Sequence, residues 1–328
     1  MSESTDQRQA KRTAPASRPP AALVIAAAFP QCAEGGGITY AWGIHQMKIV
    51  RFGKPGKERP GLIDGDGKIR DLTDIVPDIT GETLGPRTLA KLAKIKPHSL
   101  PLANSRSRIG PCVADVGNFI AVGLNFADHA AETGAKIPAE PILFNKAPSS
   151  IIGPNDQVVI PKGSKKTDWE VELAIVIGSR AHNITEAQSL SHIAGYCICN
   201  DVSERAWQSE GTGQWMKGKS APTFGPLGPW LVTTDEVPDP QNLSMFLDVS
   251  GKRRQTGSTK TMIFGVKYLV AFISKFMVLE PGDVITTGTP PGVGLGMKPQ
   301  LFLKAGDVMR LGIEKLGEQT QQCVAYSG

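Results

Sequence analysis

The sequence has 328 residues and a formal net charge of +5, with 40% apolar and 20% charged residues. This is the composition of an ordinary soluble globular protein with room for a sizeable core. Its small excess of basic residues is scattered and forms no stripe with interleaved aromatic residues, so we expect no nucleic-acid partner. The five cysteines form no pair of C-x-x-C motifs, which argues against a zinc site. Cys197 and Cys199 lie in an apolar run and are expected to be buried free thiols, which favours a reducing compartment and a cytoplasmic location.

Residues 1–46 differ from the rest of the chain. They begin polar and basic and then contain an apolar run at residues 20–30. This run is too short to span a bilayer, and although it resembles the core of a signal peptide, no cleavage site follows it cleanly. We therefore expect no membrane association. Residues 1–46 are interpreted as a disordered extension, or as a segment that precedes the true start of the protein at Met47.

Residues 47–112 are predicted to form a small N-terminal domain. Strand-like runs at 48–52 and 61–63 flank a turn rich in Gly, Pro and Lys, and residues 89–95 have helical spacing. Residues 97–111 read as a linker.

Residues 113–328 are predicted to form a strand-dominated domain. Short runs rich in Val, Ile and Leu recur at 119–123, 158–160, 171–177, 194–199, 229–232 and 284–287. Only a few segments, notably 185–193 and 264–276, have helical spacing. This pattern is not a βαβ alternation, so the expected fold class is α+β and mostly β.

Three carboxylates are candidates for a metal site. Glu170 and Glu172 lie two apart in a strand-like segment, so their side chains share one face, about 7 Å apart along the strand. The apolar continuation of this strand indicates burial rather than a solvated face, and buried carboxylates are costly unless paired or metal-bound. Asp201 ends a second apolar strand, although alone it reads better as a turn residue or helix N-cap. Three carboxylate oxygens suit a hard cation, so we predict a Mg²⁺ or Mn²⁺ site at Glu170, Glu172 and Asp201.

His129 and Glu132 follow the strand-like run at 119–123, where a short helix is expected to open near Asn125. At a spacing of i and i+3 they are neighbours on one helix face, and a carboxylate there makes the imidazole a better base. Spacing alone favours an ordinary surface His–Glu pair.

Further candidates flank Asp201. Arg205 and Gln208 follow it within two helical turns and are suited to contact a bound carboxylate. Lys219 and Lys146 are suited to neutralise a developing oxyanion. A solvent-facing long side chain is the simpler interpretation of each of these residues when it is taken alone.

A Gly-rich loop at residues 281–294 contains Thr287, Gly288 and Thr289. Such a loop after a strand can offer backbone N–H groups and hydroxyls to an anion. It lacks the Gly-Lys-Ser/Thr ending of a P-loop and the G-x-G-x-x-G opening of a dinucleotide-binding helix, so ATP and NAD are not expected.

Together these segments resemble the fumarylacetoacetate hydrolase family over residues 116–324. The resemblance is carried by residues 123–132, 168–178, 195–208, 217–229 and 279–294, and their shared order makes it specific. It implies a β-roll catalytic domain at 113–328 preceded by a small N-terminal domain, a homodimer and a small-molecule 2-oxo acid substrate.

The resemblance also implies roles for individual residues. The metal ligands would be Glu170, Glu172 and Asp201; the catalytic residues His129, Glu132 and Lys219; and the substrate-binding residues Arg205, Gln208, Lys146, Thr287, Gly288 and Thr289.

Within the family, residues 218–220, 255–262 and 289–299 are most similar to bacterial enzymes that act on sugar acids, such as 2,4-diketo-3-deoxy-L-rhamnonate and -fuconate hydrolases. This implies a metal-dependent hydrolase that cleaves a C–C bond of an acylpyruvate-type 2,4-diketo acid to pyruvate and a short acid. The alternatives on the same site are a ureidoglycolate lyase, an oxaloacetate decarboxylase, a 2-hydroxymuconate-type isomerase and a non-catalytic sugar-acid-binding paralogue. Two departures from the family pattern are Pro222, where Asp is usual close to Lys219, and Ser250, where Asn is usual.

Overall fold

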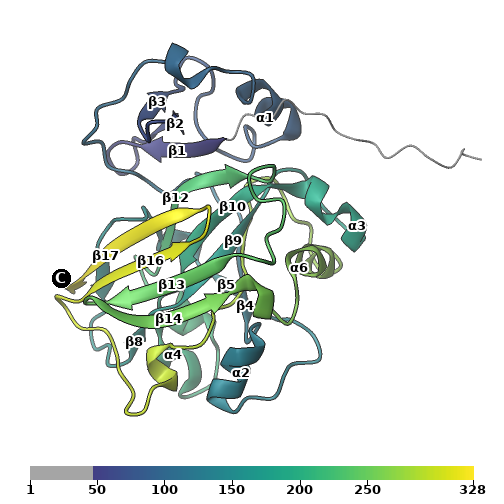
Figure 1. The fold of residues 1–328 in the computed structure, drawn as a ribbon. Coiled ribbons are helices and arrows are strands. Elements are labelled where there is room, and N and C mark those ends of the chain that lie inside the picture. The colour runs from purple at the N-terminus through teal and green to yellow at the C-terminus, as the bar shows by residue number, and fades with distance from the viewer. Residues whose placement is uncertain (1–46) are drawn as a thin grey trace, which may run out of the picture. The chain divides into compact units, whose positions relative to one another are not determined.

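The structure is a computed structural model that describes residues 47–328 (Figure 1). Residues 1–46, which the sequence suggests are an extension, lie outside the described residues. Within residues 47–328, no helix is both long enough and apolar enough to cross a membrane.

The larger sheet within residues 47–328 has ten strands in the order β3-β2-β1-β12-β10-β9-β15-β4-β5, with β6 paired to β12. Its pairs are antiparallel except β15 with β4 and β6 with β12, which are parallel. The strands are β1 (Lys48–Phe52), β2 (Arg59–Ile63), β3 (Ile69–Asp71), β4 (Phe119–Gly123), β5 (Ile142–Lys146), β6 (Ile151–Ile152), β9 (Val171–Ile177), β10 (Ile193–Asn200), β12 (Gly225–Thr233) and β15 (Val284–Thr286).

A second sheet in the described residues has five strands in the order β14-β13-β16-β17-β7. These are β7 (Val158–Ile160), β13 (Ser244–Val249), β14 (Lys252–Ser258), β16 (Val308–Ile313) and β17 (Gly317–Ala325), and a separate pair joins β8 (Thr167–Asp168) to β11 (Ser203–Glu204). Figure 1 shows β13, β14, β16 and β17 crossing in front of β9 and β10. Leucines 173, 247 and 311, from both sheets, belong to one buried cluster, so the two sheets pack face to face.

The helices are short. They are α1 (Pro86–Leu92), α2 (Ala127–Thr133), α3 (Glu186–Ser189), α4 (Arg205–Ser209), α5 (Met216–Lys219) and α6 (Val266–Ile273). Single 3₁₀ turns occur at Pro97–Ser99, Pro148–Ser150, Leu190–His192, Thr259–Thr261 and Gly294–Gly296. The predicted α+β, mostly β fold class is therefore confirmed.

The strand β9 is buried on both faces and lies between β10 and β15. One face packs in the core between the two sheets, through Val171, Leu173 and Ile175. The other packs in a second core that includes residues of β1 and β12, through Ala174 and Val176. Because both faces are covered, carboxylates at the N-terminal end of this strand are held away from bulk water.

The predicted strands at 119–123, 158–160 and 171–177 have the observed bounds, and the helix expected near Asn125 begins at Ala127. The helix expected over 264–276 is shorter, at Val266–Ile273, and the one expected over 185–193 is four residues followed by a 3₁₀ turn. Among the described cysteines, Cys197 and Cys199 are buried and free, as predicted. Because β1 pairs with β12, the N-terminal segment extends the large sheet; the domain boundary at residue 112 stays a prediction.

Candidate metal centre and active site

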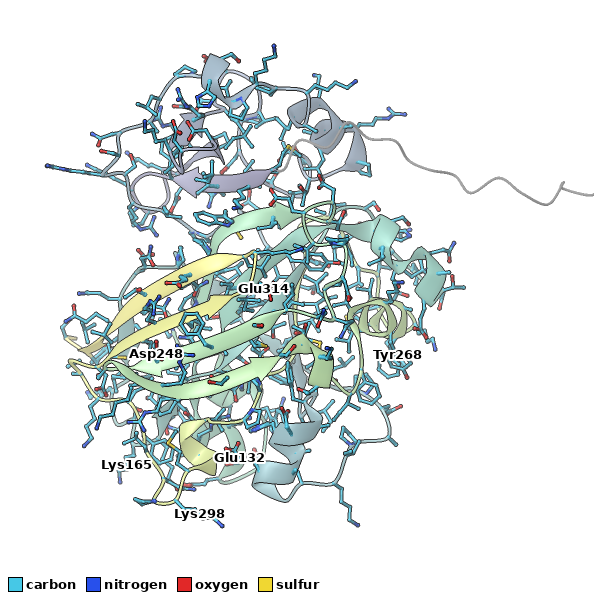
Figure 2. All side chains as sticks on the ribbon, viewed as in Figure 1. Glu132, Lys165, Asp248, Tyr268, Lys298 and Glu314 are labelled. Carbon is cyan, nitrogen blue, oxygen red and sulfur yellow. The ribbon has the colours of Figure 1, made fainter. Side chains whose placement is uncertain are left out.

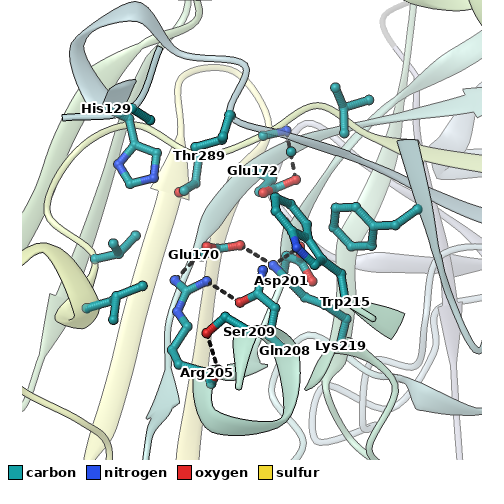
Figure 3. Close-up of a pocket in the computed structure, with 18 residues that line it drawn as sticks. His129, Glu170, Glu172, Asp201, Arg205, Gln208, Ser209, Trp215, Lys219 and Thr289 are labelled. Carbon is teal, nitrogen blue, oxygen red and sulfur yellow. Dashed lines mark hydrogen bonds and ion pairs between the residues drawn. The ribbon is translucent and has the colours of Figure 1, made fainter. Parts of the chain in front are cut away.

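Three carboxylates meet at the ends of β9 and β10. The register of the two strands pairs Glu172 with Cys199, and the N–H of Asp201 donates to the carbonyl of Glu170 over 2.9 Å. One oxygen each from Glu170, Glu172 and Asp201 lies within 4.8 Å of the others, and all three side chains are buried. They line a cavity of about 240 Å³ (Figure 3). The structure thus brings together the residues that the sequence suggests as metal ligands.

Lys219 lies among these carboxylates. The helix α5 ends at this residue, and its ammonium donates to Glu170 Oε2 and to Asp201 Oδ2 over 2.6 Å each. Burial by itself would lower the pKa of Lys219, but the negative charges of Asp201 and Glu170 outweigh it and raise that pKa. Lys219 is therefore a positive charge held at the cavity wall.

Arg205 and Lys146 provide two further positive charges. Arg205 donates to Glu170 Oε1 over 2.6 Å and to Asp168 Oδ2 over 2.9 Å. Lys146 donates to Asp201 Oδ1 over 2.6 Å and, although buried, is not among the residues that line the cavity. Both side chains therefore hold carboxylates in place as well as offering charge.

The cluster has more carboxylates than cationic side chains. Four buried carboxylates, at residues 168, 170, 172 and 201, face three cations, Lys146, Arg205 and Lys219. Burial opposes ionisation of Glu170, yet the charges of Arg205 and Lys219 lower the pKa of Glu170 to about 2.

Among the described residues, Glu172 is the carboxylate of this cluster that pairs with no cationic side chain. Within residues 47–328 it forms no ion pair with a lysine or arginine, and its Oε2 accepts only the backbone N–H of Gly288, over 2.9 Å. Burial, followed by the negative charges of Asp201 and Glu170, raises the pKa of Glu172 well above its ordinary value. A buried carboxylate short of a cation, beside two more oxygen donors, fits a hard divalent ion. The residues present therefore fit the predicted metal.

His129 also lines the cavity, and Figure 3 draws it on the opposite side from Lys219. Its Nδ1 lies 3.1 Å from Glu132 Oε2, so the predicted pair is formed. The N–H of Gly292 donates to Glu132 Oε1 over 3.0 Å. Glu132 does not itself line the cavity but joins α2 to the Gly-rich loop.

The Thr287–Thr289 segment follows β15 and runs beside the glutamates. Gly288 and Thr289 line the cavity, whereas Thr287 is buried with its hydroxyl donating to Leu173 O over 2.9 Å. Gly288 has φ of +88°, and a Cβ there would meet Asn125 at 2.9 Å, so the close approach of this loop requires glycine.

Arg205 and Gln208, from α4, both line the cavity, and Arg205 Nη1 donates to Gln208 Oε1 over 3.0 Å. In Figure 3 they lie below Glu170. All three guanidinium nitrogens of Arg205 thus have protein partners, so an incoming carboxylate would share this arginine with Glu170 and Asp168.

Sequence reasoning missed several residues of the site. Asp168 accepts from the N–H groups of Gly294 and Leu295 as well as from Arg205. Its spacing of two from residue 170 and of four from residue 172 was a usable signal, because alternate residues of an extended segment point to the same side. The cavity is also lined by apolar residues for which no local pattern gave a signal, Val122, Leu124, Ala135, Phe144, Trp215, Val293 and Leu295.

Known proteins are similar to this chain in sequence and in fold. The family model described as Fumarylacetoacetate (FAA) hydrolase C-terminal matches residues 118–324. A Burkholderia multivorans protein named "Putative hydrolase" is 59% identical over 276 residues, which cover 84% of this chain and 98% of that protein.

Two solved structures are also similar. The crystal structure of 5-carboxymethyl-2-hydroxymuconate delta-isomerase from Mycobacterium smegmatis is 32% identical, with a TM-score of 0.67, and the match covers 86% of this chain and 100% of that one. That of maleylpyruvate hydrolase from Sphingobium sp. SYK-6, in complex with manganese(II) and pyruvate, is 28% identical, with a TM-score of 0.71, and covers the same shares. Since the family model matches more than half of the sequence, this chain belongs to the fumarylacetoacetate hydrolase family.

Proposed function

We propose that this protein is a metal-dependent hydrolase that cleaves the C3–C4 bond of an acylpyruvate, a 2,4-diketo acid, to pyruvate and a short acid. The observation that carries the proposal is the buried trio Glu170, Glu172 and Asp201, in which Glu172 pairs with no lysine or arginine of the described residues, in the same cavity as Lys219, Arg205 and His129. The manganese and pyruvate held by the maleylpyruvate hydrolase structure, and the hydrolase name of the Burkholderia relative, support it.

Glu170, Glu172 and Asp201 would hold Mg²⁺ or Mn²⁺, which supplies Lewis acidity toward the 2-oxo acid end of the substrate. Lys219 places its positive charge beside the same end, where negative charge develops on the C2 oxygen. Arg205, Gln208 and the Thr287–Thr289 segment would orient the C1 carboxylate, with Lys146 fixing Asp201 behind them.

His129, oriented by Glu132, would take a proton from a water molecule as its oxygen bonds to C4. The C3–C4 bond then breaks, its electron pair passes to C3 as the pyruvate enolate, and a proton at C3 completes pyruvate. The acyl half leaves as a carboxylic acid. One water is consumed and no redox partner is needed.

The resemblance of residues 255–262 and 289–299 to the sugar-acid branch favours 2,4-diketo-3-deoxy-L-rhamnonate or -fuconate as the substrate, with lactate as the second product. As part of the same proposal, the enzyme acts as a cytoplasmic homodimer. The family resemblance supports the dimer, and the buried free thiols of the described residues support the reducing compartment. Light scattering on the purified protein measures the oligomeric state.

A substrate panel tests the proposal. Acylpyruvates, oxaloacetate, ureidoglycolate and a 2-hydroxymuconate-type diene acid are each assayed with Mn²⁺ for pyruvate, glyoxylate, CO₂ release and ultraviolet absorbance. We expect pyruvate and an acid in equal amounts from acylpyruvates. The isomerase is the second candidate, because the Mycobacterium smegmatis isomerase is similar over 86% of this chain. An absorbance shift on the diene acid, with no pyruvate from any acylpyruvate, would establish the isomerase instead.

A further inference from the structure

The cavity is lined by two chemically different kinds of side chain. Its charged residues are grouped at the carboxylate cluster, and the remaining wall includes Leu124, Phe144, Trp215, Val293 and Leu295. The rings of Phe144 and Trp215 meet edge to face, with centroids 5.2 Å apart at 63°. The cavity therefore offers apolar surface as well as the charged groups that would hold a 2-oxo acid.

The indole ring of Trp215 packs directly against the backbone of Gly123. A Cβ at Gly123 would lie 2.3 Å from Trp215 Cζ3 and 2.8 Å from Cη2, so any larger residue at position 123 displaces the indole. Trp215 is also the N-cap residue of α5, the helix that ends at Lys219. Its ring is thus held against Gly123 and its backbone at the start of this helix.

Leu124, next in the chain, is held in an unfavourable backbone conformation. Its φ is +50°, a region that a leucine rarely adopts and that Gly or Asn adopts more readily. Leu124 lines the cavity and is only partly buried. An apolar side chain is therefore present at this wall in spite of the local cost.

The hydroxyls in the cavity wall already donate within the protein. The hydroxyl of Ser209 donates to Arg205 O over 2.9 Å, and that of Thr289 donates to Val171 O over 3.0 Å. Gln208 Oε1 accepts from Arg205 Nη1 over 3.0 Å. A polar group on the far half of a substrate would have to compete with these internal contacts.

We propose that this apolar wall, Leu124, Phe144, Trp215, Val293 and Leu295, binds the acyl end of the substrate and selects acyl groups that end in a methyl or alkyl group over those that end in a hydroxymethyl group. The inference rests on the proposed function and narrows its substrate class. Apart from the indole N–H of Trp215, a terminal hydroxyl would meet only hydrocarbon side chains in this wall and would lose its water on entering, whereas a methyl gains by burial. Hydrophobic pockets reject an added hydroxyl by roughly 10–100-fold in kcat/KM, and we expect a ratio in that range.

The kinetic test compares two acylpyruvates that differ only at the end of the acyl group. These are 5-hydroxy-2,4-dioxohexanoate, which ends in a methyl, and 5,6-dihydroxy-2,4-dioxohexanoate, which ends in a hydroxymethyl. We expect kcat/KM for the methyl-ended compound to be higher by roughly 10-fold or more. Equal values, or a preference for the hydroxymethyl-ended compound, overturn the inference.

A binding test separates this inference from the proposed reaction. N-propyl oxamate and N-(2-hydroxyethyl) oxamate are nearly isosteric and need no turnover, so their affinities in the presence of Mn²⁺ are measured by calorimetry. Tighter binding of the propyl compound supports the apolar wall even if no acylpyruvate is cleaved. Equal affinity, with acylpyruvates cleaved normally, overturns the wall while leaving the proposed reaction intact.

A variant pair assigns the selectivity to the wall. Leu124→Asn places an amide in the wall and suits the positive φ, so it should fold and bring the methyl-to-hydroxymethyl ratio toward unity. Met216→Gln is the matched control, because Met216 is 41% exposed and does not line the cavity. An unchanged ratio in a folded Leu124→Asn protein, or an equal change in Met216→Gln, contradicts the role of Leu124.

Discussion

The side-chain amide of Gln255 accepts a hydrogen bond of 3.0 Å from the backbone N–H of Val171, the residue between the two site glutamates. Gln255 comes from β14 in the second sheet, and its amide nitrogen donates to Thr289 Oγ1 and to Pro290 O over 2.8 Å each. One fully buried side chain thus ties the glutamate strand to the Gly-rich loop. The second sheet contributes to the site through this contact without contributing a ligand.

We expect Gln255→Leu to weaken both stability and metal binding. It leaves the N–H of Val171 and the carbonyl of Pro290 without these partners, which costs about 1–3 kcal/mol of unfolding free energy for each unsatisfied group. Urea denaturation measures this loss, and calorimetric titration with Mn²⁺ measures the affinity. Gln319→Leu is the control, because Gln319 is an equally buried amide that bonds Ile198 O and Gly228 O, away from the cavity. Equal losses of Mn²⁺ affinity in the two variants would refute the specific role of Gln255.

Removal of the metal by EDTA should abolish turnover, and Mn²⁺ or Mg²⁺ should restore it. Binding to the folded state also raises the unfolding free energy, by about 2.7 kcal/mol when the free ion is at 100 times its Kd. Thermal unfolding with and without Mn²⁺ measures this shift, and Glu172→Gln should remove most of it. Asp66→Asn is the control. It alters a second acidic group, Asp64, Asp66 and His98, in which Arg70 already pairs with Asp64 over 2.7 Å. If Asp66→Asn removed the shift and Glu172→Gln did not, the metal centre would be misplaced.

Glu172 gives metal binding a pH dependence. Its pKa is raised by burial and by the charges of Asp201 and Glu170, so at lower pH the metal-free protein holds a proton that the metal must displace. We therefore expect Mn²⁺ affinity to fall as the pH falls, with protons released on binding. Calorimetry in buffers of different ionisation enthalpy counts these protons. A proton release that stays at zero as the pH is lowered would contradict the raised pKa.

The same pKa predicts how the stability of the metal-free protein depends on pH. The folded pKa of Glu172 lies above the unfolded value of 4.5, so the folded state retains the proton longer as the pH rises. The stabilising contribution of this group is fully present below pH 4.5 and is lost as the pH rises through the folded pKa. Urea titrations of EDTA-treated protein measure the unfolding free energy at each pH. They should show this loss of stability with rising pH in the wild type and not in Glu172→Gln.

The parts of the fold that were predictable from the sequence are those with a continuous local signal. The strand Phe119–Gly123 is an uninterrupted apolar run, and Val171–Ile177 is apolar except for Glu172; the predicted bounds of both agree with the structure. The strand Gly317–Ala325 gave no such signal, because its inward positions include Gln319 and Gln321, which are buried in a network of amides. Burial there depends on partners in other strands that no local pattern reports.

The same distinction applies to the site. Glu170 and Glu172 were predictable as neighbours because a strand alternates its faces, but their closeness to Asp201 depends on the register between β9 and β10. The three-cation, four-carboxylate balance depends on Lys146, Arg205 and Lys219 converging from β5, α4 and α5. The apolar wall is assembled from four separate segments of the chain. No regular spacing in the sequence therefore relates Trp215 to Leu124.

Glu132 has two partners, and two substitutions separate their effects. One carboxylate oxygen lies 3.1 Å from His129 Nδ1, and the other accepts the N–H of Gly292 over 3.0 Å. In Glu132→Gln the amide oxygen can still accept from Gly292, but the imidazole loses its negative neighbour, so it is a weaker base. In Glu132→Ala both contacts are lost.

Both variants should therefore slow acylpyruvate cleavage, by roughly 10²-fold, the lower end of the range for general-base catalysis. Hydrogen exchange across residues 290–297 then distinguishes them. It should be unchanged in Glu132→Gln and faster in Glu132→Ala, because only the alanine variant frees the loop from α2. Glu140→Gln, an exposed carboxylate beyond the end of α2, should alter neither rate nor exchange. A Glu132→Gln protein with full activity would mean that His129 needs no carboxylate to act as a base. Equal exchange in all three variants would mean that Glu132 does not hold the loop.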